Sequence, residues 1–162
     1  MDYTLRVTDE QVLIFPGAIV VGDVSIGQRV NIWYNAVVRG DEGAISIGAD
    51  TNVQDGTVIH ANTVIGRGCT IGHAAVLHGC RIGDNSLIGM GSILLDGATI
   101  GNDCIVGAGS LVTGKFSCPD GMMILGNPAR VVRPLTADER ACNAQYAQDY
   151  LAMSRDFRAM SP

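Results

Sequence analysis

Aromatic residues and long apolar runs are both scarce in this chain of 162 residues. Only 5% of the residues are aromatic although 47% are hydrophobic, so a folded core must be built from aliphatic side chains. No stretch approaches the ~20 consecutive apolar residues that a membrane-spanning helix needs. The first residues, MDYTLRVTDE, lack the basic and apolar regions of a secretory signal peptide. We therefore expect a single domain with no membrane segment.

Positive charge is scarce as well. Lys and Arg number 11 against 16 Asp and Glu, which gives a net charge of −5 and no basic run. This balance argues against nucleic acid or an anionic membrane as a partner. The five cysteines are an odd number without the spacing of a disulfide framework. Cys69, Cys80 and Cys104 each lie two residues before a regularly spaced aliphatic residue, so we expect them to be small core residues of a reduced, cytoplasmic protein.

Aliphatic residues recur every six residues along most of the chain. The series breaks twice, with nine residues from Val38 to Ile47 and five from Leu77 to Ile82, and such changes in length belong at corners. A unit this short suits one strand and a bend, so that three units form a triangular coil and successive coils stack as parallel strands. The sequence therefore predicts a parallel β-helix. Its interior is lined by seventeen register positions: Ile14, Val20, Ile26, Ile32, Val38, Ile47, Val53, Ile59, Ile65, Ile71, Leu77, Ile82, Ile88, Leu94, Ile100, Val106 and Val112.

The residue after each register position is also informative. It is glycine eight times, as a bend with positive φ or a close backbone approach would require. Four hexads carry a large polar residue there instead: Arg39, Gln54, His60 and His78. Counting hexads places Arg39, His60 and His78 in one column over three successive coils, and brings Gln54 and His73 into adjacent coils of the preceding face. The alternative is a solvated surface, but these departures coincide on neighbouring faces and favour a site.

A helix is predicted at the C-terminus. The hexad period fades after Val112, and we expect the β-helix to occupy residues 1–134 and the helix to lie in residues 135–162, without a separate second domain. Thr136 and Glu139 have the spacing of a capping box, which predicts that the helix begins there and runs to about Met160. The helix is expected to pack along the coil or on a neighbouring subunit. Its predicted apolar stripe is Cys142, Tyr146, Tyr150, Met153, Phe157 and Met160.

The chain has three histidines, and their placement suits a metal ion. His60 and His78 lie one strand spacing apart, which suits two ligands of one ion. His73 lies one face away, so we expect a neighbouring subunit to supply it in a homotrimer with three equivalent interface sites. Three imidazoles with an open position are the ligand set of a catalytic zinc, and they also accept iron or cobalt. The alternative, a structural site with Cys80 as a fourth ligand, fits less well because Cys80 belongs to an inward-facing position.

This ligand set predicts a chemistry. A zinc ion on three imidazoles lowers the pKa of bound water from 15.7 toward ~7, and the resulting hydroxide attacks CO2 or hydrolyses an ester. Gln54 is the candidate to orient that hydroxide, because its amide both donates and accepts hydrogen bonds. Asp55 is expected to hold Gln54 or a ring N–H, and Arg39 to pair with Asp41 across the subunit boundary.

Four motifs, VVRGDEG, NVQDGTVIH, GH followed by LHGCRIG, and GNPARVVRPLT, resemble those of the γ-class carbonic anhydrase family. The resemblance covers the chain from about Ile14 to the C-terminal helix. It implies a left-handed β-helix, a homotrimer and metal-hydroxide hydration of CO2 to bicarbonate, which is a lyase (carbonate dehydratase) reaction. The metal ligands implied are His60 and His78 of one subunit and His73 of the next.

The resemblance also implies roles for other residues. Arg39 and Asp41 match the subunit contact, and Glu42 matches an acidic position beside it. Gln54 and Asp55 match residues near the metal, with Asn52 and Gln54 expected to contact substrate. Tyr150 aligns with a helix tyrosine of many short members of the family, although ordinary packing explains it equally well.

One departure from the family pattern bears on activity. The archetypal enzyme carries an acidic loop with a proton-shuttling glutamate after the position of His60, whereas this chain continues Ala61-Asn62-Thr63-Val64. Proton export must then use Glu42, Tyr150 or buffer, so we expect slow turnover. Two alternatives stay open: a metal-dependent thioesterase or other acyl-group enzyme, since hexapeptide coils also occur in CoA-dependent acyltransferases, and a low-activity assembly or structural member of the family.

Overall fold

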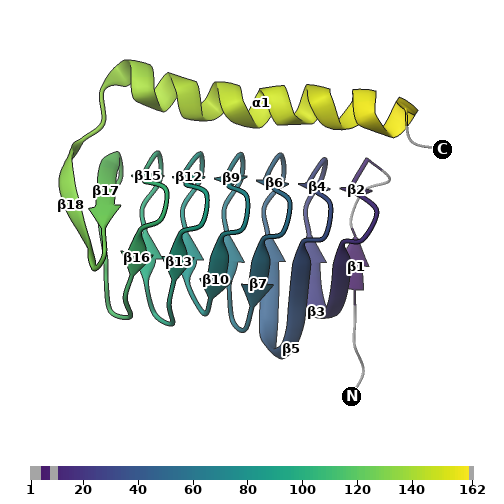
Figure 1. Cartoon of the computed structure of the whole chain (residues 1–162), viewed down its shortest axis with the longest axis horizontal. Helices are drawn as coiled ribbons and strands as arrows, with labels where there is room; N and C mark the ends of the chain where they lie inside the picture. The colour runs from purple at the N-terminus through teal and green to yellow at the C-terminus, as the bar shows by residue number, and fades with distance from the viewer. Residues whose placement is uncertain (1–4, 8–10, 161–162) are drawn as a thin grey trace.

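The computed structural model describes residues 5–7 and 11–160, and they form a coil of short strands with one long helix beside it (Figure 1). Apart from the final hairpin between β17 and β18, all paired strands are parallel. We name three faces by their order along each coil. The first face contains β2 (Leu13–Ile14), β4 (Asn31–Ile32), β6 (Asn52–Val53), β9 (Thr70–Ile71), β12 (Leu87–Ile88), β15 (Ile105–Val106), β17 (Met122–Gly126) and β18 (Ala129–Pro134).

The second and third faces share two long strands that turn the corner between them. These are β3 (Ile19–Ile26) and β5 (Val37–Ile47). The second face continues with β7 (Val58–His60), β10 (Val76–His78), β13 (Ile93–Leu94) and β16 (Leu111–Val112). The third face contains β1 (Leu5–Val7), β8 (Val64–Ile65), β11 (Arg81–Ile82) and β14 (Thr99–Ile100).

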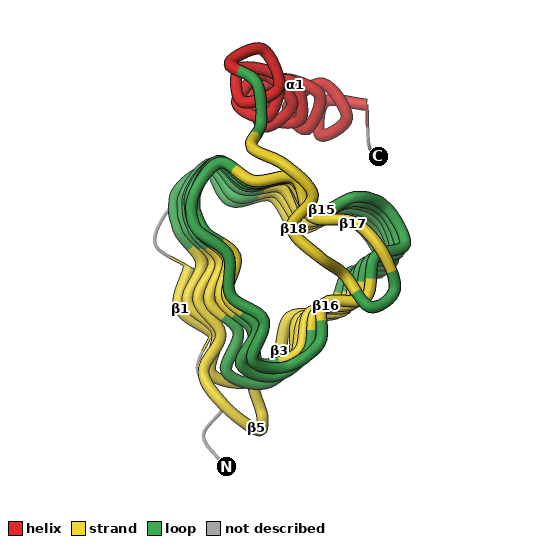
Figure 2. The backbone as a smooth tube through the Cα atoms, turned by 90° about the vertical axis from the view of Figure 1, so that its left-hand side faces the viewer, coloured by secondary structure: helices red, strands yellow, loops and turns green. Residues whose placement is uncertain are grey.

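The coil is left-handed, as the family resemblance implied. Figure 2 looks along the axis from the end that carries β17 and β18, toward which the chain advances. From that end the faces of β15, β16 and β1 follow one another clockwise. A path that advances toward the viewer while turning clockwise is a left-handed helix. Together with the parallel strands and the helix at the C-terminus, this confirms the predicted fold.

The predicted register forms the core. Fifteen of the seventeen register positions are buried, among them Ile32, Ile59 and Leu77, each with no exposed surface. The exceptions are Ile14, which is 42% exposed, and Val20, which is partly buried; both lie in the first coil, which has no coil beneath it. Cys69, Cys80 and Cys104 are buried in the same core, as predicted.

The glycine after a register position is required by a close approach of the next coil. None of the eight glycines at this position has a positive φ. A Cβ on Gly72 would lie 2.7 Å from the backbone nitrogen of Met90, and one on Gly48 would lie 2.5 Å from the backbone of Gly66. Of the two explanations offered by the sequence, close backbone approach therefore holds. His60 and His78 replace this glycine on the second face, where a side chain has room to point outward.

The nine-residue spacing between Val38 and Ile47 lies at a corner, as predicted. There β5 projects outward from the coil between the second and third faces (Figure 2). The pairing of β3 with β5 shifts register between Gly22 and Val24, which accommodates the extra residues. This projection carries Asp41 and Glu42 beyond the wall of the coil.

The helix α1 (Ala137–Met160) lies along the coil of its own chain (Figure 1) and contacts β4, β6 and β9. The capping box forms as predicted: the Thr136 hydroxyl accepts from the Glu139 N–H at 3.2 Å, and the Glu139 carboxylate accepts from the Thr136 N–H at 2.9 Å. No helix among residues 5–7 and 11–160 combines the length and the apolar character needed to cross a bilayer.

The predicted apolar stripe of α1 was correct only in part: Tyr150 and Phe157 contact Trp33 of the coil, but most of the stripe is exposed. Its members Tyr146, Met153 and Phe157 are 51%, 40% and 38% exposed, and Cys142 is exposed too, while Tyr150 is partly buried. The side chain of Met160 lies outside the described residues. The buried positions are instead the smaller residues Asn143, Ala147, Leu151 and Ser154.

The physical reason is that the middle of the helix rests on backbone turns of the coil, and the aromatic contact is confined to Trp33, which Tyr150 and Phe157 meet edge-on with ring centroids 5.4 and 5.5 Å apart. The Asn143 amide donates to the carbonyl oxygens of Asn85 and Cys104 at 3.3 and 3.2 Å. Small side chains permit that close approach, and they leave the aromatic flank of α1 half-exposed.

Candidate metal centre

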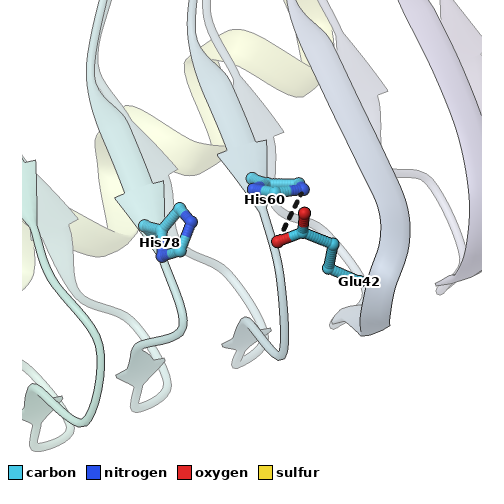
Figure 3. Close-up of side chains that lie close together, drawn as sticks. All are labelled: Glu42, His60 and His78. Carbon is cyan, nitrogen blue, oxygen red and sulfur yellow. Dashed lines mark ion pairs between the residues drawn. The ribbon is translucent and has the colours of Figure 1, made fainter.

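The fold aligns His60 and His78 as the hexad count predicted. His60 ends β7 and His78 ends β10, and the two residues are direct partners in the parallel pairing of these strands. Arg39 of β5 is the partner of His60 on the other side, which completes the column of three. The two imidazole rings lie with their centroids 5.0 Å apart and their planes at 64°. Both side chains leave the second face on the same side of the coil (Figure 3).

Two carboxylates from the projecting part of β5 lie against His60. The Asp41 Oδ1 atom is 3.0 Å from His60 Nε2, and the Glu42 Oε2 atom is 3.9 Å from the same nitrogen. Desolvation pushes the pKa of Asp41 up, but hydrogen bonds from its own backbone and from His60, with the charge of Arg39 nearby, hold that pKa below its ordinary value. Asp41 therefore stays ionised, and the His60 ring is oriented by a hydrogen bond to a carboxylate.

Glu42, His60 and His78 together form a cluster of metal-binding donors. Their ligand atoms all lie within 4.8 Å of one another, and Figure 3 shows the Glu42 carboxylate turned toward His60. Among the described residues this cluster does not include His73. Two imidazoles and a carboxylate suit a divalent transition metal. The sequence had assigned Glu42 only to an acidic family position and to proton export.

His73 lies on the first face, in the turn after β9. The Asp55 Oδ2 atom is 2.9 Å from His73 Nδ1, and the Tyr150 hydroxyl is 3.5 Å from His73 Nε2. Burial, with the nearby Asp55 charge, raises the pKa of Tyr150, so the phenol is protonated and can donate to Nε2. If Nδ1–H donates to Asp55, the Nε2 lone pair is left available. Asp55 thus contacts a ring N–H, one of its two expected partners.

Gln54 is fixed by its neighbours. Its Oε1 atom accepts from the backbone N–H of His73 at 3.1 Å, and its Nε2 atom donates to Asn52 Oδ1 at 3.2 Å. Asn52 donates in turn to the Thr70 hydroxyl at 2.9 Å. Gln54 is 5% exposed and Asn52 is fully buried. The predicted proximity of Gln54 and His73 in adjacent coils is therefore present, and both amides are held in single orientations.

Asp96 was missed by the sequence analysis. Its Oδ2 atom lies 2.9 Å from His78 Nδ1, so each of the three histidines has a carboxylate partner. Asp96 lies one residue beyond the position that stacks on His78, because the pairing of β10 with β13 joins residues 17 apart, so the hexad count did not single it out. Arg39 and Asp41 lie two residues apart within β5 and form an ion pair inside the chain. The expected pairing of these residues across a subunit boundary stays a prediction.

A groove of about 410 Å³ adjoins His73. It lies between α1 and the first face, and Gln54, His73 and Tyr150 line it at one end. The rest of its lining is mostly apolar and includes Leu87 and Ile105. The backbone of the register glycines forms part of its floor. This groove connects the polar residues around His73 with the exposed flank of the helix.

Comparisons with known proteins place the chain in a family. A family model described as "Bacterial transferase hexapeptide (six repeats)" matches residues 79–114. The chain is 48% identical over 149 residues to "Probable carbonic anhydrase" of Methanocaldococcus jannaschii, which covers 90% of this chain and 94% of that protein. It is 43% identical over 159 residues to Protein YrdA of Escherichia coli, covering 91% and 86%. "Gamma carbonic anhydrase 1, mitochondrial" of Arabidopsis thaliana is 42% identical over 154 residues, and the chain spans 56% of that protein's length.

Solved structures agree with the fold. A hexapeptide transferase family protein from Anaplasma phagocytophilum superposes with a TM-score of 0.81 at 37% identity, covering 92% of this chain and 99% of that one. A variant of perosamine N-acetyltransferase from Caulobacter crescentus, in complex with CoA and GDP-perosamine, superposes with a TM-score of 0.66 at 28% identity, covering 75% and 57%. With the M. jannaschii and E. coli relatives matched over almost their whole length, the chain belongs to the γ-class carbonic anhydrase family of hexapeptide-repeat proteins.

Proposed function

We propose that this chain is the subunit of a γ-type carbonic anhydrase, which hydrates CO2 to bicarbonate at a metal centre shared between subunits. The observation that carries the proposal is the pairing of His60 and His78 on adjacent strands, with ring centroids 5.0 Å apart. Two imidazoles at this separation suit one cation. Family membership implies a metal and supports CO2 as the substrate.

The proposed ligand set is His60 and His78 of one subunit and His73 of the next. The donors fit such an ion, because His73 and His78 each have a carboxylate on Nδ1, which leaves Nε2 to bind; at His73 the cation would replace the Tyr150 hydroxyl as the partner of Nε2. Zinc is the proposed metal, with iron or cobalt as alternatives for an all-imidazole set. When bound, such a cation supplies the Lewis acidity that lowers the pKa of a coordinated water toward neutrality.

The chain's own residues then orient the imidazole rings and the substrate and carry the proton away from the site. Asp41, Asp55 and Asp96 hold the three rings in place. The Gln54 amide, fixed against Asn52, presents a directed hydrogen-bonding group beside His73 for substrate or water. Glu42, whose side chain is 67% exposed next to His60, is the proposed route for the proton to reach buffer.

The homotrimer that this site requires is supported by a column of apolar side chains on the second face. At the position before each register residue, the outward side chains are all aliphatic and are paired in register from coil to coil. They are Ile19, Val37, Val58, Val76, Ile93 and Leu111. Ile19, Val58 and Ile93 are 55%, 37% and 39% exposed in the single chain. An exposed apolar stripe on the face that carries His60 and His78 suits contact with another copy.

The test is CO2 hydration measured on protein of known metal content. Protein purified aerobically and anaerobically would be reconstituted with zinc, iron or cobalt and assayed by stopped flow with a pH indicator. The proposal predicts turnover proportional to bound metal, with one metal per chain, and loss of both metal and turnover in His60→Ala. Metal-loaded protein without hydration above the buffer rate would contradict it.

A second function is favoured by one observation, the apolar groove beside His73. Its volume of about 410 Å³ and its mostly apolar lining suit an extended acyl or pantetheine arm, and a structurally similar acetyltransferase binds CoA. On this hypothesis the same metal centre would hydrolyse a thioester. A series of acyl-CoA substrates distinguishes the two: thioesterase turnover that is abolished by Ala108→Trp, at an exposed residue that lines the groove, with CO2 hydration retained, would establish the second activity.

A further inference from the structure

Two cysteines meet in the core near the C-terminal end of the coil, away from the histidines. Cys104 lies just before β15, and Cys118 follows the isolated bridge between Thr99 and Ser117. Their Sγ atoms are 3.9 Å apart. Cys104 is fully buried and Cys118 is 5% exposed. Neither residue belongs to the candidate metal centre.

The same chain provides two cysteines for comparison. Cys69 and Cys80 occupy the same inward position as Cys104, two residues before a register aliphatic, and both are buried. Burial raises the pKa of each of these two thiols to about 12, so they remain protonated. Neither makes a sulfur–sulfur contact like that of Cys104; the Cys69 thiol, for example, donates to the Gly83 carbonyl at 3.1 Å. They have the properties of inert core residues.

Cys104 has a different environment. The thiol of Cys118 hydrogen-bonds to it, and the backbone N–H of Met122 points to its Sγ at 3.5 Å. The Cys118 contact is the main cause that lowers the pKa of Cys104 to about 7, against the opposing effect of burial, while the pKa of Cys118 is raised. We assign Cys104 as the nucleophilic member of the pair, because its Sγ also accepts from the Met122 N–H.

We propose that Cys104 and Cys118 form a reversible redox pair, which closes to a disulfide on reaction with a small peroxide. The Cys104 thiolate attacks one peroxide oxygen, the O–O bond breaks, and a sulfenic acid forms with release of water or an alcohol. The Cys118 sulfur then attacks the Cys104 sulfur, the S–O bond breaks and a second water leaves. Two thiols are oxidised and one peroxide is reduced. The sulfur atoms must approach from 3.9 Å to the ~2.05 Å of a disulfide bond.

The burial of the Cys104–Cys118 pair limits which oxidants can reach it, and its place in the coil determines what a disulfide there would stabilise. Because Cys104 has no exposed surface and Cys118 is 5% exposed, a local opening must admit the oxidant, which restricts it to a molecule as small as hydrogen peroxide and excludes a bulky disulfide. Closure would join β15 to the segment that leads into β17, around residues 105–117. The Cys104 carbonyl also accepts from Asn143 of α1. The bond would therefore strengthen the end of the coil on which the helix rests.

Peptide mapping of the native protein tests the proposal directly. Trypsin cleaves after Lys115, so Cys104 falls in residues 82–115 and Cys118 in residues 116–130, whereas Cys69 and Cys80 share residues 68–81. The folded protein would be treated with stoichiometric hydrogen peroxide, blocked with iodoacetamide and digested. We expect a linked pair of peptides 82–115 and 116–130 that dithiothreitol separates. The number of free thiols should fall from five to three in the parent. In Cys142→Ser, which lacks the exposed thiol, it should fall from four to two.

A single-cysteine variant tests the order of events. In Cys118→Ser, which keeps a small buried hydroxyl at this position, Cys104 should accumulate as a sulfenic acid that dimedone labels, while Cys69 and Cys80 stay unlabelled. The proposal is overturned if peroxide leaves peptides 82–115 and 116–130 separate while Cys142 is oxidised. It is equally overturned if the disulfide between these peptides forms only after denaturation, because the contact between the two sulfur atoms in the folded protein would then not promote it.

Discussion

His60 and His78 are direct partners across two parallel strands, and their rings lie with centroids 5.0 Å apart. The register of the coil produces this arrangement: the two histidines are 18 residues apart, which is one coil at this point, and both replace the glycine that follows a register aliphatic. The backbone thus sets the spacing between the rings, and only their orientation depends on neighbouring side chains.

The orientation is predicted to depend on carboxylates. Asp96 contacts His78 Nδ1 at 2.9 Å. Asp96→Asn removes the charge that fixes the ring tautomer, and we expect metal affinity to fall by about 10- to 100-fold with unchanged secondary structure. Isothermal titration of apo-protein with zinc measures the effect. Asp103→Asn serves as the control, because Asp103 lies in an equivalent turn with positive φ and is remote from the histidines.

The identity of the third ligand is a separate prediction. Within one chain Glu42 completes a donor cluster with His60 and His78, whereas the proposal assigns the third position to His73 of a neighbour. We expect His73→Ala to lose most of its bound metal, and Glu42→Gln to retain it while turnover becomes more dependent on buffer concentration. Metal analysis after gel filtration measures the first effect and stopped flow the second. Metal lost from Glu42→Gln but kept in His73→Ala would identify a site within one chain.

The apolar column on the second face should determine the oligomeric state. Ile93 is 39% exposed and lies one coil beyond Val76 in this column. A charge there would be buried without a partner in a trimer, so Ile93→Asp is expected to give monomers that lack bound metal. Val64→Asp is the matched control, since Val64 points outward from the third face. Sedimentation velocity should give a trimer for the parent and for Val64→Asp; a trimeric Ile93→Asp would count against this interface.

The start of α1 provides a prediction about stability and pH. Thr136→Ala removes a helix cap and should lower the free energy of unfolding by about 1 kcal/mol. Its partner in the cap is Glu139. Hydrogen bonds from the Arg133 guanidinium and from the Thr136 backbone N–H lower the pKa of the Glu139 carboxyl to about 2.

Because this pKa is lower than the ordinary value of 4.5, the stabilisation from Glu139 should be complete above about pH 4.5 and disappear as the pH falls through about 2. Thermal unfolding of Glu139→Gln and the parent across this range measures the difference. A difference that stayed constant down to pH 2 would exclude ionisation of Glu139 as its source.

Much of this molecule could be predicted from its sequence because the hexad period is a strong constraint. Val38, Ile59 and Leu77 had to stack, and so the residues that follow each of them had to form a column. The capping box at Thr136 was equally local, since both of its hydrogen bonds join residues three apart.

The misses share a different physical origin. The buried side of α1 depends on what the helix packs against, and the backbone turns of the coil favoured Asn143 and Ala147 over the larger aromatic residues. Asp96 lies in the turn after β13, one residue beyond the position that stacks on His78, so the period of the repeat does not place its carboxylate at the ring.

The most direct test of the shared centre is subunit mixing. His73→Ala chains and chains carrying both His60→Ala and His78→Ala would be unfolded, mixed and refolded, with each variant refolded alone as the control. If one subunit supplies the pair and its neighbour the third imidazole, mixed trimers regain metal and CO2 hydration that neither variant has alone. If mixed trimers form but bind no more metal than the separate variants, the histidines do not meet across the boundary between chains.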